Sequence, residues 1–299
     1  MTTQEYLESI LKEQALSSDS QEIKDVMKER ERVEAILTKE FKDSKPTIRY
    51  AGSKAKNTMI RDSYDLDIAC YFAHDDSDPG SSLRDIYDNV KKTLQTGYIV
   101  EPKSSALRLK SSDSKNVRVD FHIDIVPGRY INNESTDVYL HISSGEKKYL
   151  KTNLHKQVDH IKDSGKTDII KLIKYWKVRW GIQIRTFVLE LLVVEVLKKS
   201  DPAKFESCLM KFWTELRDNI DKIKVEDPAN PTGNDLSECF DQAVKSSLSS
   251  LARIALQYVE QDNWKGIFGE VKPASTAEKL AAVDIIIKQG GTSPKPWLR

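Results

Sequence analysis

The sequence has few cysteines, no strong excess of charge of either sign and no long apolar segment. Its 3 cysteines, Cys70, Cys208 and Cys239, are far apart and form no CxxC pair. This spacing indicates neither a disulfide framework nor a cysteine-based zinc site, and it fits a reducing cytoplasm. No stretch approaches the roughly 20 apolar residues that span a bilayer. The first residues also lack a secretion signal, so we expect a cytoplasmic protein that does not enter a membrane.

The charges are nearly balanced. Lys and Arg number 47 against 46 Asp and Glu, for a net charge of +1. Such a balance predicts a well-solvated surface and gives no reason to expect tight binding of nucleic acid. At 299 residues the chain is long for one core and short for three, which favours two lobes that share an interface.

The order of patterns along the chain predicts an α+β protein. An amphipathic helix over 21–43 precedes Pro46, and a further helix is expected over 82–94. Short strands are expected near 47–51, 66–73, 106–112, 117–126 and 138–142. After about residue 153 the pattern is helical, with runs at 154–163, 167–180, 186–199, 204–223, 238–261 and 275–288. We therefore predict an α/β lobe over 1–152 and a helical lobe over 153–299, with a structured loop over 225–237.

The residues that carry chemistry are gathered in the segment 50–72. A first strand runs into Gly52 and Ser53, and the next strand carries Asp65 and Asp67 on one face because side chains alternate along a strand. Adjacent carboxylates repel one another unless a divalent cation neutralises them, and Mg²⁺ prefers such oxygen ligands. The Gly-Ser turn offers the N–H and hydroxyl donors that a triphosphate needs. Each feature alone is common, whereas their combination predicts a metal site next to a phosphate site.

A third carboxylate is expected from a neighbouring strand, because a two-metal site needs a ligand for the ion that activates the attacking hydroxyl. In the segment 117–128, alternation puts Asp120, His122 and Asp124 on one face, and periodicity alone does not choose between the two aspartates. We assign no catalytic role to His122, since a histidine on the wet face of a strand is ordinarily solvated.

Taken together, these motifs resemble the oligoadenylate-synthase and cGAS/DncV-like nucleotidyltransferases, whose bacterial members are called CD-NTases. The resemblance extends over most of the chain through GS, DLDIA, IDIVPG, IIKLIKYWK (169–177), RTFVLELLV (185–193) and DPANPTGN (227–234). It implies a polymerase-β-type α/β lobe with the active cleft facing the helical lobe. It also implies that Asp65, Asp67 and Asp124 hold two Mg²⁺ ions, which Mn²⁺ can replace, and that Gly52 and Ser53 bind the nucleotide.

Two further residues are nucleotide-site candidates. Lys171 and Lys174 lie on a polar helix flank, and the resemblance favours Lys174 as a contact to NTP phosphates. Thr152 or Asn153 can act as the N-cap of the helix that follows. In the resembling synthases this junction lines the base pocket, and an Asn there would favour UTP. We expect the aromatic residues Tyr175, Trp176 and Trp180 to pack in the core.

One departure from the resembling proteins concerns the turn after Gly-Ser. Relatives often carry Lys-Gly-Thr there, whereas this chain has Lys56, Asn57 and Thr58, which makes the shape of the short helix uncertain. The chain also lacks a Cys/His insertion that would build a zinc thumb, so direct sensing of duplex DNA is not expected.

The resemblance implies a template-independent synthase that joins NTPs, with UTP and ATP favoured, into a cyclic di- or trinucleotide messenger in bacterial antiphage signalling. The resemblance also implies a regulatory protein partner and a downstream effector that the cyclic product activates. Two alternatives stay open: a nucleotidyltransferase that modifies RNA or protein, and a catalytically inactive binding homologue. The retention of all three carboxylates and of Gly52-Ser53 weighs against the inactive homologue.

Overall fold

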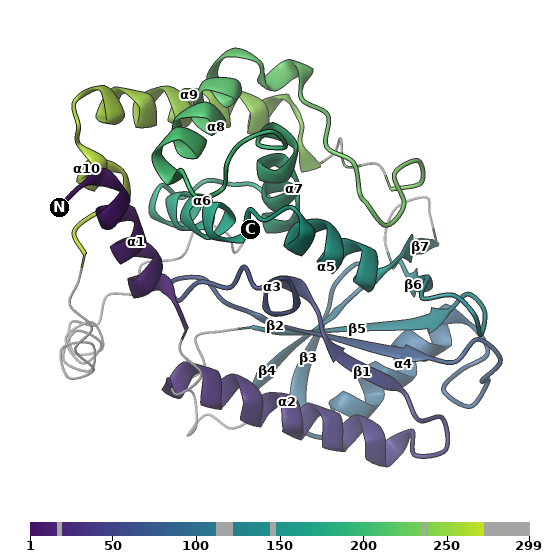
Figure 1. Ribbon diagram of the computed structural model, residues 1–299. Helices are drawn as coiled ribbons and strands as arrows, with labels where there is room; N and C mark the ends of the chain where they lie inside the picture. Colours follow the sequence, from purple (N-terminus) through teal and green to yellow (C-terminus); the bar gives the residue numbers. More distant parts are fainter. Residues whose placement is uncertain (17–19, 112–121, 144–147, 235, 237–238, 272–299) are drawn as a thin grey trace.

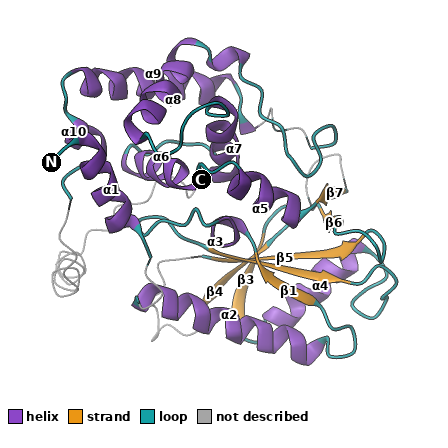
Figure 2. Cartoon of the chain, in the orientation of Figure 1, coloured by secondary structure: helices purple, strands orange, loops and turns teal. Residues whose placement is uncertain are grey.

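The computed structural model describes residues 1–16, 20–111, 122–143, 148–234, 236 and 239–271. A mixed sheet with helices on both faces occupies the first half, and a cluster of helices occupies the second (Figures 1 and 2). The helices are α1 (Thr3–Gln14), α2 (Gln21–Glu40), α3 (Gly52–Lys56), α4 (Leu83–Leu94), α5 (Leu154–Asp163), α6 (Thr167–Arg179), α7 (Thr186–Val196), α8 (Phe205–Asp218), the 3-10 turn η1 (Ile220–Lys222), α9 (Gln242–Glu260) and α10 (Trp264–Phe268). The strands are β1 (Thr47–Tyr50), β2 (Leu66–Phe72), β3 (Tyr98–Pro102), β4 (Leu107–Ser111), β5 (Ile123–Tyr130), β6 (Val138–His141) and β7 (Tyr149–Thr152). The predicted α+β class is confirmed.

The sheet runs in the order β1-β2-β5-β4-β3, and β6 and β7 extend it from the far end of β5. The neighbours β2 and β5 are parallel, whereas β4 pairs antiparallel with β5. Alternate residues of β2, from Leu66 to Phe72, pack against α2 and α4 in one apolar core. Asp67 lies on the opposite face, which α3 and the helical part of the chain cover (Figure 1). The period of two therefore separates a purely structural face of the sheet from a polar one.

Local sequence signals explain where several helices begin. The Ser82 side chain caps α4 by accepting a bond from the Asp85 N–H, and the Asp85 side chain accepts a bond from the Ser82 N–H. Together these two bonds form a capping box. Ser20 caps α2 by accepting a bond from the Ile23 N–H. The buried side chains of α2 recur at helical spacing and include Val26, Val33 and Leu37. These signals account for the agreement between the predicted and observed positions of both helices.

The helical half has its own core, built around Trp176 of α6 and Trp213 of α8, whose rings meet edge to face. Tyr175 and Trp176 are buried there and Trp180 packs against the same core, as predicted. Helix α1 joins this core rather than the sheet, because Tyr6, Leu7 and Ile10 are buried in it. The predicted boundary between 152 and 153 stays a prediction, and both α1 and Ile60 of the first segment pack across it.

Some predicted elements differ from those observed. The strand expected over 117–126 is observed as β5 from Ile123 to Tyr130, and 112–121 lies outside the described residues. The short elements α1, β3, β7 and α10 were not predicted, and the helix expected over 275–288 lies outside the described residues. Within the described residues, no helix combines the length and the apolarity needed to cross a bilayer.

Candidate active site

The two parallel strands at the centre of the sheet bring the predicted carboxylates together. Asp67 of β2 and Asp124 of β5 lie directly opposite one another in the register of the pair. Asp65 precedes β2 by one residue, and its Oδ1 accepts a bond from the backbone N–H of His122 at 3.3 Å. His122 itself is exposed, and Asp120, the alternative third carboxylate, lies outside the described residues. The aspartate that adjoins Asp67 in the described residues is therefore Asp124.

The Gly-Ser turn lies against Asp67. The Ala51 N–H donates to the Asp67 carbonyl oxygen at 2.8 Å, and the chain then turns at Gly52, whose φ is +52°. A Cβ on Gly52 would lie 1.7 Å from Asp67 Oδ2, so only glycine fits here, for both its backbone angle and its lack of a side chain. Ser53 follows in the first turn of α3. The candidate phosphate turn and the candidate metal ligands thus share one location.

Asn57 stands where the resembling proteins often carry the glycine of Lys-Gly-Thr. This residue ends α3 in the left-handed conformation, with φ 59° and ψ 35°. Glycine adopts that conformation without strain, and asparagine is the residue type that next most often does so. Asn57 therefore preserves the helix end that a glycine would form, and the uncertainty about α3 is resolved.

Electrostatic repulsion at the site is visible in Asp67. Burial, together with the neighbouring charges of Asp124 and Asp65, raises the pKa of this carboxyl to about 6, against the opposing effect of Lys56 and Lys174. A carboxylate whose ionised form is this unfavourable is stabilised by an added cation. The three aspartates consequently offer hard oxygen ligands with an electrostatic preference for a divalent ion.

Sequence reasoning missed Arg108, which contacts one of these carboxylates. Arg108 of β4 lies opposite Asp124 across the antiparallel pair. Its Nε donates to Asp124 Oδ1 at 2.8 Å and its Nη2 to Oδ2 at 2.7 Å. These bonds raise the pKa of the Arg108 guanidinium. Among the described residues, no three His, Cys, Asp or Glu side chains are arranged as a metal-binding group.

Lys174 was predicted on a polar flank, and that position is wrong. Its side chain is buried, and its Nζ donates to the Thr58 carbonyl oxygen at 2.7 Å. Helix α6 is covered here by α7 and by the segment that follows α3, which helical periodicity alone does not reveal. Burial lowers the pKa of Lys174 to about 8, and Glu190 of α7 opposes that decrease. The predicted contact with NTP phosphates stays a prediction, and this geometry does not support it.

Glu190 is the centre of the network that holds Lys174. Fully buried, it accepts bonds from Lys56 Nζ and from Thr58 Oγ1, the latter at 2.5 Å, and it lies 4.0 Å from Lys174 Nζ. Lys56 and Thr58 flank the end of α3, so the network ties the Gly-Ser helix to α6 and α7. A single glutamate inside the apolar run TFVLELLV is the sequence signal that could have revealed it, since a buried charge requires a partner.

Lys177, one turn beyond Lys174 on α6, lies in the electrostatic environment of Asp65, as Lys174 also does. Its Nζ donates to Thr186 Oγ1 at 3.0 Å. Burial lowers its pKa, and Asp65 and then Glu190 oppose the decrease. Lys171 instead pairs with Asp168 on its own helix at 2.9 Å. Lys174 is buried and bonded to Thr58, whereas Lys177 is half-buried, so Lys177 is the more accessible of these two cations for a phosphate near Asp65.

Asn153 is an N-cap, one of the two roles considered for it. Its Oδ1 accepts from the Lys156 N–H at 3.0 Å, and its amide nitrogen donates to Thr136 Oγ1 at 2.9 Å and to Asp137 Oδ1 at 2.6 Å. The residue is 1% exposed. Both amide donors are engaged within the protein, so the prediction that UTP is accepted no longer rests on Asn153.

The loop over 225–237 docks beside this junction. Asp227 Oδ2 accepts from Asn234 Nδ2 at 2.6 Å, and the same amide donates to the Lys151 carbonyl oxygen at 3.1 Å. Both loop side chains are buried. The predicted structured loop is thus held against the start of α5.

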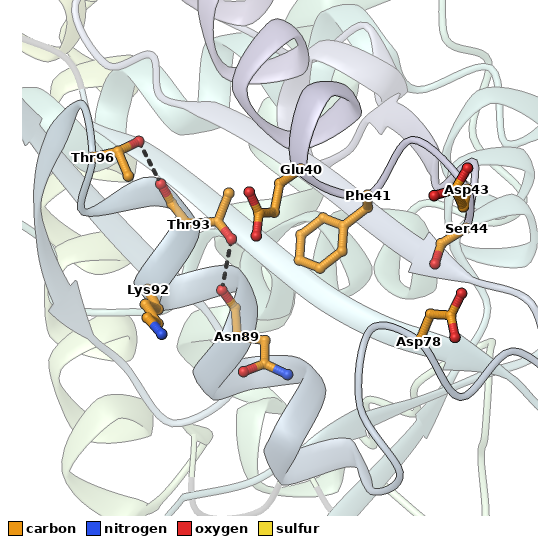
Figure 3. A pocket seen from close by; sticks show the side chains of 9 residues that line it. All are labelled: Glu40, Phe41, Asp43, Ser44, Asp78, Asn89, Lys92, Thr93 and Thr96. Carbon is orange, nitrogen blue, oxygen red and sulfur yellow. Dashed lines mark hydrogen bonds between the residues drawn. The ribbon is translucent and has the colours of Figure 1, made fainter.

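A cavity of about 360 Å³ lies between the end of α2 and α4, away from the candidate metal ligands Asp65, Asp67 and Asp124 (Figure 3). Glu40, Asp43 and Asp78 line it together with Lys92, so acidic groups dominate its rim. The hydroxyls of Thr93 and Thr96 bond to carbonyl groups of the α4 region. An acidic cavity on the structural face of the sheet does not suit a triphosphate, and it adds nothing to the site around Asp67.

Comparisons with known proteins concern the sequence and the fold of the chain as a whole. No family profile matches the chain. A curated relative, the cyclic AMP-AMP-AMP synthase of Escherichia coli strain MS 115-1, is 26% identical over 221 residues, which cover 62% of this chain and 67% of the relative. The E. coli MS115-1 CdnC:HORMA-deltaN complex contains a chain that superposes with a TM-score of 0.67 at 20% identity, covering 91% of this chain and 98% of that one. The Bradyrhizobium diazoefficiens CD-NTase CdnG in complex with GTP superposes with a TM-score of 0.65 at 14% identity, covering 88% and 94%. The resemblance drawn from the motifs and the assignment to the nucleotidyltransferases are confirmed.

Proposed function

The chain is a cGAS/DncV-like nucleotidyltransferase in sequence pattern and in fold, and from this premise we propose that it joins NTPs without a template into a cyclic di- or trinucleotide. The observation that carries the proposal is the contact between Gly52 and Asp67, which places a turn suited to phosphate next to carboxylates suited to metal. The curated relative is named as a synthase of a cyclic trinucleotide, which supports a cyclic product for this chain as well.

Three features of the site fit a divalent cation. The donor set is three carboxylates, the ligand type that Mg²⁺ and Mn²⁺ prefer. Because Gly52 has no side chain, the Asp67 carboxylate lies directly against the Gly-Ser turn. The pKa of Asp67 is raised to about 6 by burial and by the charges of Asp124 and Asp65, so an added cation would stabilise its ionised form. Asp65, Asp67 and Asp124 would hold the ions. When bound, two such ions would neutralise the carboxylates, activate an acceptor hydroxyl and stabilise the leaving pyrophosphate.

The protein's own groups bind and orient the nucleotide. Ser53 and the N–H groups at the start of α3 donate hydrogen bonds to the triphosphate, and Gly52 allows its close approach. Lys177 supplies a positive charge near Asp65. The network around Glu190 keeps α3 fixed against the helical half, so that the donors do not need to reorganise during the reaction.

The product and its biological use follow from the same proposal. ATP is the favoured substrate because the curated relative makes a product of AMP units, and acceptance of UTP stays a prediction. A cyclic product implies a downstream effector that it activates, in antiphage signalling within the cytoplasm. The CdnC chain in complex with a HORMA protein supports a regulatory protein partner for this chain too.

The proposal is tested by incubating the purified chain with all four radiolabelled NTPs, Mg²⁺ or Mn²⁺ and no template. Phosphatase treatment and chromatography then separate the products. A small phosphatase-resistant product is expected. Label that appears instead on added RNA or on protein would favour transfer to a macromolecule, and the absence of any product would favour an inactive binding homologue.

A further inference from the structure

Arg108 and Asp124 form a bidentate ion pair inside the proposed metal site. The two bonds, at 2.8 and 2.7 Å, occupy one hydrogen-bonding direction of each carboxylate oxygen. Their side chains are 25% and 17% exposed, so water screens the pair only in part. Two parallel charge-assisted bonds make this geometry stronger and more rigid than a single lysine contact would be.

The backbone holds the two residues in place. Arg108 and Asp124 are directly opposite in the register of β4 and β5, with Leu107 and Leu109 buried on either side of the arginine. The arginine therefore has little freedom to move along the sheet, whereas its long side chain can change direction above it. Asp124, in turn, is fixed between Arg108 on one neighbouring strand and Asp67 on the other.

A second carboxylate lies on the other side of Arg108. Glu101 of β3 is its direct partner across the β3-β4 pair, and it contributes to the electrostatic environment of the guanidinium. Lys103 and Lys110 now hold the Glu101 carboxylate. Arg108 thus stands between Asp124, which it contacts, and Glu101, which is placed to receive it.

We propose that Arg108 is the internal counter-ion of Asp124 and that a divalent cation must displace it before Asp124 can act as a ligand. The proposal deepens the proposed function, since it concerns the same metal site. In the metal-free chain the guanidinium neutralises Asp124 and relieves its repulsion with Asp67. On metal binding it leaves Asp124 and turns toward Glu101. Arg108 is therefore a positioning residue that lowers the affinity for metal.

The proposal predicts that removing the guanidinium strengthens metal binding. The full-length chain, free of nucleotide, is titrated with Mn²⁺ while electron paramagnetic resonance reports the free ion. Arg108→Gln is expected to bind Mn²⁺ about tenfold more tightly than the wild type, because the ion no longer competes with charge-assisted hydrogen bonds. Arg108→Lys, which keeps the charge and loses the bidentate geometry, is expected to fall between the two.

Two controls separate this effect from a general change in charge. Arg84→Gln removes an exposed arginine that pairs with Asp88 on α4, and it should leave Mn²⁺ affinity unchanged. In an Asp124→Asn background, Arg108→Gln should no longer raise Mn²⁺ affinity, since no carboxylate remains to be released. Thermal unfolding of each variant verifies that it is folded, and a variant that does not fold is replaced in the comparison by Arg108→Lys.

Weaker or unchanged Mn²⁺ binding by the folded Arg108 variant would overturn the proposal, as would an equal gain in the Asp124→Asn background. Failure of the proposed function is a separate result. A gain in Mn²⁺ affinity without any nucleotide product would uphold the counter-ion and refute the synthase, whereas product formation with no gain would do the reverse.

Discussion

Replacing Glu190 with glutamine is expected to destabilise the chain strongly, because this buried carboxylate neutralises a pair of buried lysines. Glu190 is fully buried, Lys174 is 3% exposed and Lys56 is 7% exposed. The substitution keeps the volume and an acceptor for Thr58 but removes the negative charge. Breaking a buried ion pair by removing one partner costs about 3–5 kcal/mol, and the retained acceptor places Glu190→Gln near the lower value, at about 3 kcal/mol.

The loss of stability caused by Glu190→Gln should also depend on pH. The pKa of Lys174 is about 8 with Glu190 in place, below its usual value, and losing Glu190 lowers it further. Below pH 8 the wild type and its unfolded chain both carry the proton, so Lys174 adds no pH dependence there. In the variant the folded form releases the proton and the unfolded form keeps it. The penalty should therefore widen as the pH falls from 8, by up to about 1.4 kcal/mol per unit.

Urea unfolding followed by circular dichroism, at pH 8 and pH 6, measures both effects. Glu195→Gln is the matched control, since Glu195 lies on the same helix and pairs with Lys198 at the surface. Its cost should stay within about 0.5 kcal/mol at both values of pH. A penalty for Glu190→Gln below about 1 kcal/mol, or one equal at both pH values, would refute the account of the buried network.

Three further predictions concern residues at or near the site. Asp67→Asn, studied in EDTA, should stabilise the folded chain by up to about 3 kcal/mol above pH 6. The reason is that the pKa of Asp67 is raised to about 6 in the folded chain, so the wild type loses stability as the pH rises through that value. Urea unfolding should show that the gain vanishes near pH 4. Gly52→Ala should abolish nucleotide binding in calorimetry and should cost more stability than Gly181→Ala. Gly181 also has a positive φ, but no atom lies within 4 Å of its added Cβ, so that control should cost about 1–2 kcal/mol. Equal costs for the two variants would contradict the clash with Asp67. Asn153→Ala should cost more than the roughly 1 kcal/mol expected for Asp241→Ala, an exposed N-cap, and should leave the ratio of nucleotide products unchanged; a shift toward purines would restore a base-reading role.

Much of the site was predictable because the signals are local. Alternation placed Asp65 and Asp67 on one strand face, and a glycine and serine at the end of the previous strand indicated a turn for phosphate. The choice of Asp124 came from the resemblance, and the register with Asp67 is consistent with it. Asn57 illustrates a local rule as well, since a left-handed helix end admits asparagine in place of glycine.

The remaining features depend on contacts between distant segments. Arg108 meets Asp124 through the register of two strands, which no spacing within β4 encodes. Lys174 has polar character in the sequence, yet α7 and the segment that follows α3 pack over α6 and bury it. Position along a helix defines which residues share a face, whereas the neighbour that covers that face is a property of the tertiary structure.

The most direct test of the central claim is the mass of the products that the purified chain makes from ATP, UTP, GTP and CTP with Mn²⁺, compared with those of Asp67→Asn. The account predicts a product with the mass of a cyclic oligonucleotide in the wild-type reaction and none in the variant reaction. A product of equal yield in both reactions, or only linear products that retain a triphosphate, would contradict it.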